Sequence, residues 1–600
     1  MGSITRLEEL DEENIRTEYQ EKLYKIRKEQ VEYYTRGLKS ILESIDETLL
    51  GSCPETNSSS EKTLSTPSLP QEHFRPISHK TPYKFHNFAK LHNHKNITTI
   101  TLRASHPLGF ISNANKLSSE RFTEMNNNNI NGTMSAAGKP YDIVILGASG
   151  FAGKYVTREA LKFLSDPNSP LKTVALAGRS PARLSETLAW AISDFAGEKP
   201  PPNVYTVSAD TGDSVSLSIL AAQAKIMINC VGPYQHLGEA VVAACVSQGC
   251  DYLDISGEPE FMERIEMLYH RKAVENGSLV VSSCGTDSIP AEIGLLFHLR
   301  HWKSPATPNR VVTYLQSDRK VAVNYSTYES AVYGYANAEK LMKIRKSRSS
   351  RPRPRIPGPP PSQYSEPVVQ RQKLLDLWSV HLPVADASVV RRTLTTLTES
   401  PDGLAGKNES GDYAANRRSF WSSIKPVYFS TKVATKSILG LLPFLSLGFF
   451  FDKLSKSPLG RRLLLNYPSL FSLGMFSKQR PTKEEVERGN FTMWFVGEGY
   501  SDGGAAVKKA DTAVITRLRG PDMGYITCSR VLIQCALVML SERGNLPAGG
   551  VYTPGIVFGP SDLQERLQKN GLDFEHVSTS TSSLSDAVGS TTSPCLILGQ

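Results

Sequence analysis

The sequence lacks the features that mark several large classes of protein. Its eight cysteines form no Cys-x-x-Cys pair, so neither a zinc site nor a disulfide framework is indicated, and buried thiols in a reducing compartment are expected. Residues 1–20 carry several acids and no apolar core, unlike a secretory signal or an organelle transit peptide. The net charge of +9, from 68 basic and 59 acidic residues, is modest for 600 residues. We therefore expect an intracellular protein without a metal site or a nucleic-acid partner.

The most apolar run of the sequence is too short to cross a membrane as a helix. The most apolar stretch, residues 438–451, is fourteen residues long and is interrupted by Pro443, whereas a spanning helix needs about 20 residues. Basic residues flank it, including Lys436 before it and Lys453 after it. Such a segment suits a peripheral contact with a membrane or lipid surface, or equally a buried core or homodimer-interface helix. The sequence favours neither alternative.

A glycine-rich turn follows the first clear strand pattern. The apolar run 141–146 indicates a buried parallel strand, and a helical pattern begins directly after the turn. Glycines in such a turn allow a pyrophosphate to approach the free N–H groups at the start of the helix. The spacing G-x-x-G-x-x-G is a variant of the dinucleotide fingerprint. The cofactor-binding residues expected in this turn are Gly147, Ser149, Gly150, Phe151 and Gly153.

The second expected strand ends without the acid that NAD-specific sites use to hold the ribose hydroxyls. Arg179 stands there instead and can pair with a 2′-phosphate, so NADP is favoured over NAD. Asp210 follows the third strand and suits either contact with the adenine amine or capping of the next helix. Gly232 follows the fourth strand and would let the nicotinamide side of the cofactor approach the backbone.

Strands and helices alternate between residues 139 and 288. This alternation predicts a doubly wound, Rossmann-type parallel α/β sheet that forms an NAD(P)-binding domain. The expected strands are 141–146, 173–178, 203–207, 225–230, 251–255 and 278–282. Helices are expected near 151–165, 181–195, 214–223, 236–248 and 260–276.

The remaining chain predicts one further domain and several irregular parts. Residues 289–576 show patterns typical of antiparallel strands, which indicate a second α+β domain for substrate binding or dimerisation. A basic, proline-rich segment at 340–361 indicates a surface loop, with a nuclear address as the alternative. Within this domain, 321–335 indicates strand or mixed structure, 525–543 a buried helix and 549–555 a turn. Outside it we expect a charged helical segment 1–50, a disordered region 51–135, an enzyme proper that begins near Met134, and a disordered tail 577–600.

No catalytic residue is predicted. The Tyr-x-x-x-Lys spacing of short-chain dehydrogenases occurs only where no sheet-end helix would present it. Glu258 and Asp287 follow the fifth and sixth strands and could bind substrate, although capping and loop bracing are the favoured roles. Residues 234–236 (Tyr-Gln-His) are expected to face a substrate or, alternatively, to form only a turn and a helix start.

Several segments together resemble a known family. GASGFAGKYV, LAGRS, NCVGPY, CDYLDISGE, CGTDSIPAEIG and GGVYTPGIVFG are similar to the saccharopine dehydrogenase-like oxidoreductases, which include the trans-acting enoyl reductases. The resemblance covers residues 139–575, and it departs from the family pattern at Thr286, where relatives usually have phenylalanine. It implies an NAD(P)-binding domain, a second domain that closes over it and often dimerises, and, for plant members, a mitochondrial location.

Three functions fit these observations. The favoured one is an NADP-dependent reductase that acts on a lipid-like or other small-molecule substrate, at a mitochondrial membrane or another lipid surface. The second is saccharopine dehydrogenase itself, which would need converging basic residues for the carboxylates of its substrate; no motif identifies such a cluster. The third is a non-catalytic, lipid-associated protein that retains a nucleotide-binding fold.

Overall fold

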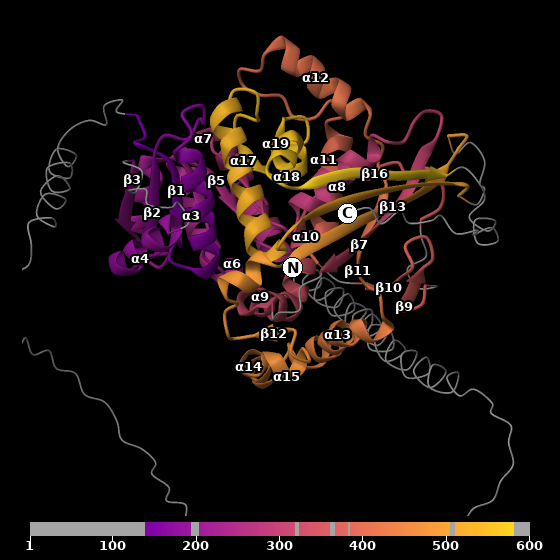
Figure 1. The fold of residues 1–600 in the computed structure, drawn as a ribbon. Coiled ribbons are helices and arrows are strands. Elements are labelled where there is room, and N and C mark those ends of the chain that lie inside the picture. Colours follow the sequence, from indigo (N-terminus) through magenta and orange to yellow (C-terminus); the bar gives the residue numbers. More distant parts are fainter. Residues whose placement is uncertain are drawn as a thin grey trace, which may run out of the picture. The chain divides into compact units, whose positions relative to one another are not determined.

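A computed structural model describes residues 138–193, 203–317, 323–360, 366–381, 384–503 and 510–580 (Figure 1). The predictions for segment 1–50, region 51–135 and all but the first residues of the tail therefore lie outside the described residues. The described chain forms two seven-stranded sheets and one two-stranded sheet. The strands of the second large sheet follow the first six strands of the first sheet along the chain.

The first sheet is parallel throughout and has the strand order β15-β6-β5-β4-β1-β2-β3. Six of its strands are β1 (Tyr141–Leu146), β2 (Val174–Gly178), β3 (Val204–Ser208), β4 (Ala224–Asn229), β5 (Asp251–Asp254) and β6 (Leu279–Val281). The helices between them are α3 (Phe151–Leu164), α4 (Pro181–Ile192), α5 (Ser214–Gln223), α6 (Tyr234–Ser247) and α7 (Pro259–Asn276). Strands β1 and β2 are apolar at almost every position because helices cover both faces of the sheet. The prediction of a doubly wound Rossmann-type fold is confirmed.

The seventh strand of this sheet comes from a distant part of the chain. Strand β15 (Gly550–Tyr552) pairs in parallel with β6, and α18 (Pro554–Phe558) follows it. The prediction of a turn over 549–555 was wrong. Three residues between glycines and a proline are too few to show the alternation of apolar and polar residues that indicates a strand. They form a strand because they pair with β6.

The second sheet is mixed, with the order β16-β14-β13-β7-β11-β10-β9. Its strands are β7 (Thr307–Ser317), β9 (Val369–Gln372), β10 (Leu377–His381), β11 (Tyr428–Thr435), β13 (Asn490–Tyr500), β14 (Thr512–Pro521) and β16 (Asp573–Ser580). Only β7 and β11 pair in parallel. Helices α8 (Ile289–Leu299) and α11 (Asp386–Glu399) pack on it. This is the α+β architecture expected after the Rossmann sheet, although β16 runs four residues into the predicted disordered tail.

Two segments of the second domain differ from their predicted structure. Residues 321–335 are mostly helix: after the short β8 (Val323–Asn324) comes α9 (Tyr325–Ala336). The basic segment 340–361 begins as a helix, α10 (Ala338–Ser347), rather than as a loop. Lysine, leucine and methionine favour helix, and the acid in the first turn and the bases in the last turn suit the helix dipole. The prolines that indicated a loop begin only at residue 352.

The apolar segment 438–451 folds into η1 (Ile438–Leu441) and the first part of α13 (Leu442–Leu454). Its side chains at Leu445, Leu447 and Phe451 are buried, and α13 packs against α9. Three short elements follow: α14 (Pro458–Asn466), α15 (Pro468–Phe471) and β12 (Phe476–Ser477), the last of which pairs with β8. Figure 1 shows these elements grouped beside α9. Two other helices of the second domain are α12 (Gly411–Ser422) and α16 (Lys483–Glu487).

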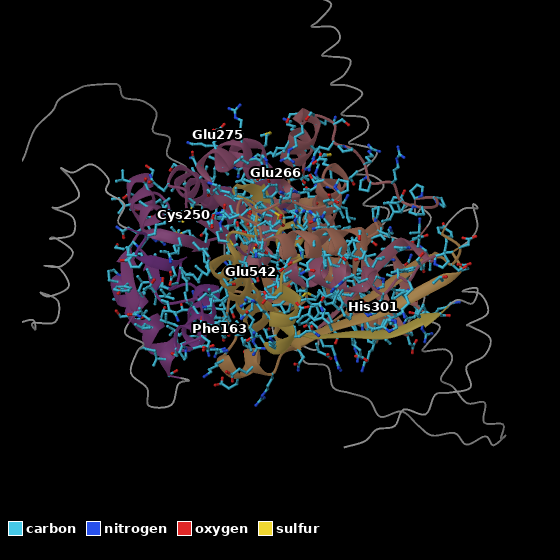
Figure 2. The ribbon with its side chains drawn as sticks, turned by 90° about the horizontal axis from the view of Figure 1, so that it is seen from above. Phe163, Cys250, Glu266, Glu275, His301 and Glu542 are labelled. Atoms are coloured by element: carbon cyan, nitrogen blue, oxygen red, sulfur yellow. The ribbon has the colours of Figure 1, made fainter. Side chains whose placement is uncertain are left out.

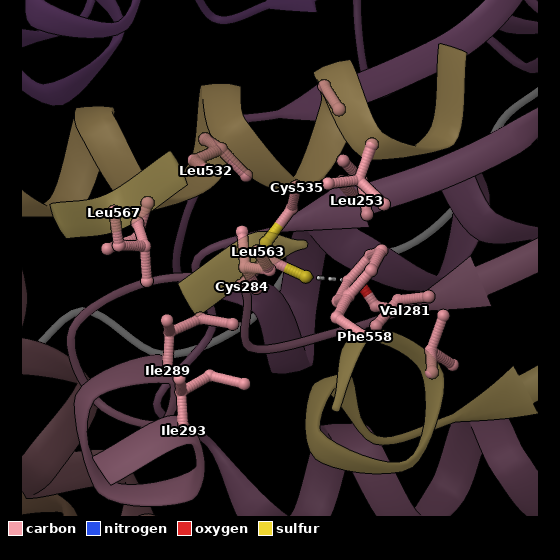
Figure 3. Close-up of a cluster of buried hydrophobic side chains, with 14 of the residues drawn as sticks. Leu253, Val281, Cys284, Ile289, Ile293, Leu532, Cys535, Phe558, Leu563 and Leu567 are labelled. Atoms are coloured by element: carbon pink, nitrogen blue, oxygen red, sulfur yellow. Dashed lines mark hydrogen bonds between the residues drawn. The ribbon is translucent and has the colours of Figure 1, made fainter. Parts of the chain in front are cut away.

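A long helix joins the two sheets. The predicted buried helix is the π-helical turn η2 (Met523–Thr527) followed by α17 (Cys528–Glu542), which packs against α3 and against α19 (Leu563–Lys569). Together they are long and apolar enough to cross a membrane, but 78% of that window is buried inside the fold, as in the core helix of a globular protein. Figure 3 shows the core at this junction, where Cys284 and Phe558 meet Leu532 and Cys535 of α17.

Candidate functional site

A cavity of about 2700 Å³ lies at the carboxyl edge of the first sheet and extends to the second domain. Seven of the eight predicted cofactor residues line it, namely Gly147, Ser149, Gly150, Phe151, Arg179, Asp210 and Gly232. On the opposite side its walls come from α9, α10, α11 and β11. The cavity is large enough for a dinucleotide and a substrate together.

Steric contacts explain the glycines of the turn. Gly147 has a φ of +83°, and a β-carbon there would lie 2.6 Å from a methyl group of Val231. Gly153 does not line the cavity but lies behind the turn, where a β-carbon would be 2.2 Å from the carbonyl oxygen of Gly147. Gly150 begins α3 without a side-chain cap, and its N–H donates to Gly147 O at 2.9 Å. The first N–H groups of α3 are therefore presented to a ligand in the cavity.

The residues after β2 fit a 2′-phosphate. Arg179 is exposed and lines the cavity together with Arg183. Ser180, the next residue, caps α4: its Oγ accepts from the N–H of Arg183 at 3.4 Å. At the end of β2 the chain offers a guanidinium where NAD-specific sites carry an acid, and a guanidinium pairs well with phosphate.

Asp210 is an exposed residue on the cavity wall, and it does not cap the next helix. Its Oδ1 accepts from Gly212 N at 3.0 Å, which braces the turn after β3. The cap of α5 is Asp213, whose Oδ1 accepts from Val215 N at 3.0 Å. The capping alternative was therefore wrong by three residues, and contact with the adenine stays a prediction.

The turn after β4 is held by Glu258. Its two carboxylate oxygens accept from the N–H groups of Tyr234 at 3.0 Å and Gln235 at 2.9 Å, so Glu258 caps α6 as the sequence favoured. Of the three residues expected to face a substrate, Tyr234 and Gln235 line the cavity and His236 does not. The ring of Tyr234 is largely buried, and its hydroxyl donates to Asn229 O at 2.9 Å. Gly232 has open space on the cavity side, since a β-carbon there would meet only Tyr234, at 3.5 Å.

Asp254 at the end of β5 braces the neighbouring loops. It accepts from the N–H groups of Ser256 at 2.9 Å and Ser283 at 2.8 Å, and from the hydroxyl of Ser282 at 2.9 Å. Burial raises the pKa of Asp254 to about 6, although these hydrogen bonds lower it in part. Its role is structural, because its acceptors are occupied by the loops that it holds.

Asp287 is one of several acids that line the cavity. Its carboxyl group lies against the backbone of Gly257, where a β-carbon would be 2.4 Å from Asp287 Oδ2. Burial raises the pKa of Asp287. Asp386, at the start of α11, is buried nearby, and its pKa is raised well above the usual range by burial and then by the charges of Asp287 and Glu292. Oδ1 of Asp386 accepts no hydrogen bond within the described chain.

The sequence singled out Asp287 but missed Asp386. Asp386 begins a helix in the second domain, 99 positions after Asp287 in the printed sequence, and no motif links the two residues. Sequence reasoning also missed residues that line the cavity, such as Arg345 and Arg391, which come from helices α10 and α11. Only the packing of the second domain against the first brings them to the cavity.

The parallel sheet and the residues that line the cavity are typical of an NADP-binding oxidoreductase. The profile of the saccharopine dehydrogenase NADP binding domain matches residues 143–281. An Arabidopsis thaliana relative, named as a probable mitochondrial saccharopine dehydrogenase-like oxidoreductase, is 55% identical over 73% of this chain and 96% of its own length. The human saccharopine dehydrogenase-like oxidoreductase is 33% identical over 74% of this chain and 100% of its own. A Caenorhabditis elegans lipid droplet localized protein is 32% identical over 72% and 98%. The chain belongs to the saccharopine dehydrogenase-like oxidoreductase family.

Proposed function

We propose that this protein is an NADP-dependent reductase of a C=C, C=N or C=O bond in a lipid-like small molecule. The observation that carries the proposal is Asp287, a desolvated carboxyl group on the wall of the cavity that the glycine turn also lines. The seven predicted cofactor residues that line the cavity are proposed to hold the cofactor, with Arg179 for the 2′-phosphate, and Gly153 is proposed to support the turn from behind.

The chain can supply the proton that such a reduction requires. NADPH, when bound, supplies a hydride. The second atom of the reduced bond must gain a proton, and Asp287 would donate it from a carboxyl oxygen. Burial keeps Asp287 protonated to a higher pH than an ordinary aspartate, and the neighbouring Asp386 disfavours ionisation of both groups at once.

The far wall of the cavity supports a lipid-like substrate. Its lining includes the apolar side chains Met342, Phe429, Phe444, Met475 and Phe476. The name of the worm relative associates that protein with lipid droplets, and the name of the plant relative associates that one with mitochondria. We infer that this protein works at one of these lipid surfaces.

One observation favours saccharopine dehydrogenase as a second candidate. Arg345 and Arg391 both line the cavity. Arg345 is held by Glu263 at 2.6 Å, whereas Arg391 reaches the same carboxylate only at 3.9 Å. Arg391 could therefore turn to a substrate carboxylate, as a dicarboxylate substrate would require.

Calorimetric titration with NADPH and NADH tests the cofactor site. We expect NADPH to bind more tightly than NADH, and Arg179→Ala to lose about tenfold to a hundredfold in NADPH affinity with little change for NADH. Arg271→Ala is the matched control, because this arginine lies on α7 with 93% of its side chain exposed. Binding of neither nucleotide by the wild-type protein would contradict the proposal.

A substrate panel then separates the candidates. Consumption of NADPH is followed with apolar enoyl thioesters, ketones and imines, whereas reduction of NADP⁺ is followed with saccharopine, because its secondary amine gives up a hydride. Turnover of an apolar substrate supports the reductase. Turnover of saccharopine, lost in Arg391→Ala, favours the second candidate, and cofactor binding without any turnover favours a non-catalytic lipid-associated protein.

A further inference from the structure

The helices that follow the apolar segment present large hydrophobic side chains to solvent. Five of them form a surface that we call the outer leucine face: Leu459, Leu463, Tyr467, Leu470 and Leu473. Leu459 is 69% exposed and Leu470 is 67% exposed. Fourteen large hydrophobic side chains of the described chain are exposed, and these five lie within fifteen consecutive positions. Isolated exposed hydrophobics are common on protein surfaces, but a concentration of this kind marks a contact surface.

The spacing of the face follows the helix. Leu459 and Leu463 are four residues apart in α14 and therefore share one side of it, and Tyr467 follows four residues later, where the helix ends. Gly460 and Leu464, on the adjacent side, are buried against the fold. The helix therefore has an apolar stripe directed outward in addition to the apolar side that packs inward.

Leu473 extends the face in an unusual conformation. It has a φ of +49°, which a leucine rarely adopts, and its side chain is 60% exposed. Gly474, with a φ of +83°, completes the turn. A leucine held in the left-handed region and directed outward is costly for the fold, and such strain is concentrated at functional positions.

The charge around the face is almost entirely positive. Ten lysines and arginines lie between Lys425 and Lys483, and Asp452 is the single acid among these 59 residues. Asp452 is buried and paired with Lys456 at 3.0 Å. Lys453 and Arg462 are exposed beside the face.

We propose that the outer leucine face docks on an anionic lipid surface. Exposed leucines and a tyrosine can enter the interfacial region of a lipid layer while the surrounding lysines and arginines attract its phosphate groups. A second copy of this chain fits less well, because two such faces would bring like charges together. The docking segment is thus 459–473, beyond the run 438–451 that the sequence singled out, in which Leu441, Leu445, Leu447 and Phe451 are buried.

Docking would bring the cavity next to the lipid. Leu473 and Gly474 line the cavity, as do Pro443 and Phe444 of the preceding helix. A substrate with an alkyl chain could then enter from the lipid surface. This consequence rests on the proposed reductase, whereas docking itself does not.

The test measures sedimentation of the full chain with vesicles, without any activity measurement. We expect binding to vesicles of phosphatidylcholine with phosphatidylserine, weaker binding to phosphatidylcholine alone, and a loss of binding with rising salt. Leu459→Glu/Leu470→Glu should weaken binding by at least about a hundredfold, since each buried leucine contributes about tenfold or more. Lys453→Ala/Arg462→Ala should weaken it by about twentyfold.

The matched control is Val215→Glu/Ile219→Glu, which replaces two exposed apolar residues of α5 that are 65% and 53% exposed. This variant should bind vesicles as the wild type does. NADPH titration of every variant shows whether it remains folded. Equal vesicle binding by the leucine variant and the wild type would overturn the proposal. If the leucine variant also changed from dimer to monomer, the face would instead contact a second copy of this chain.

Discussion

At the scale of single residues, the site depends on atoms that are absent as much as on those that are present. Gly153 does not touch the cavity, yet the lack of a side chain there allows α3 to approach the carbonyl of Gly147. Asp287, by contrast, is proposed to act through its carboxyl group, whose pKa is raised by burial. Both residues are visible in the sequence, but only the structure shows what surrounds each of them.

Gly153→Ala should lower NADPH affinity by about tenfold or more without contacting the cofactor. The new methyl group would lie 2.2 Å from a backbone oxygen, so the glycine turn must move away from α3. Calorimetric titration measures the loss. Gly138→Ala, at a position where a β-carbon meets nothing within 4 Å, is the control. Unchanged affinity of the Gly153 variant would show that the turn tolerates the shift.

Asp287→Asn should lower kcat by about a hundredfold or more and leave NADPH affinity unchanged, because amides do not donate a proton in place of a carboxylic acid. The wild-type rate should fall as the pH rises through the raised pKa of Asp287, since only the protonated acid can donate. The variant should lack this limb of the pH profile. The exposed Asp412→Asn serves as a control, and an identical pH profile in the Asp287 variant would exclude Asp287 as the proton donor.

At the scale of elements, α10 shows how ion pairs fix a helix that the sequence indicated as a loop. Glu263 on α7 has only 4% of its side chain exposed, and Arg345 of α10 contacts it at 2.6 Å. Glu266, one turn further along α7, pairs with Arg348 at 3.2 Å and Arg392 at 2.9 Å. Figure 2 shows Glu266 among other side chains, whereas Glu275 of the same helix lies at the periphery. The basic residues that suggested a nuclear address thus bind acids of the Rossmann domain.

Glu263→Gln should destabilise the contact of α10 with α7 by about 3 kcal/mol, because it leaves Arg345 partly buried without its countercharge. Hydrogen exchange of the α10 amides should rise accordingly. Glu275→Gln, which removes an exposed partner of Arg271 on the same helix, should leave exchange unchanged. If both variants exchange alike, the ion pair does not hold α10.

At the scale of the whole molecule, the two domains share one core. Figure 3 shows Leu253 and Val281 of the first sheet in the same cluster as Ile289, Ile293 and Leu563 of the second domain. Glu292 adds a polar link in this region: its carboxylate accepts from Gly555 N and from the hydroxyl of Thr393. Burial raises the pKa of Glu292 to about 7.

The pKa of Glu292 predicts how stability depends on pH. The folded state binds this proton more tightly than the unfolded state, whose pKa is near 4.5. Its contribution is therefore fully present below pH 4.5 and is lost as the pH rises through about 7, by about 3 kcal/mol in all. Glu292→Gln should lose this part of the pH dependence in urea unfolding at pH 5 and pH 8. The exposed Glu186→Gln should retain it, and an equal pH dependence in wild type and Glu292→Gln would contradict the assignment.

The sequence by itself determined the Rossmann half of this protein. Its six expected strands and the glycine turn were predicted correctly, because a buried parallel strand is a continuous apolar run and a tight turn requires glycine, both of which are local properties. The family resemblance, carried by the same local segments, was confirmed by the relatives. Arg179 indicated NADP for the same reason: a single residue at the end of one strand decides that contact.

Only the tertiary structure decided the rest. The strand β15, the helix α10 and the proximity of Asp386 to Asp287 each depend on a partner that is distant in the chain. A short or charged segment has no period of its own, so its conformation follows from what it packs against. The outward direction of Leu459 and Leu470 has the same origin, since the sequence shows that a leucine is present but only the fold determines which side of a helix remains exposed.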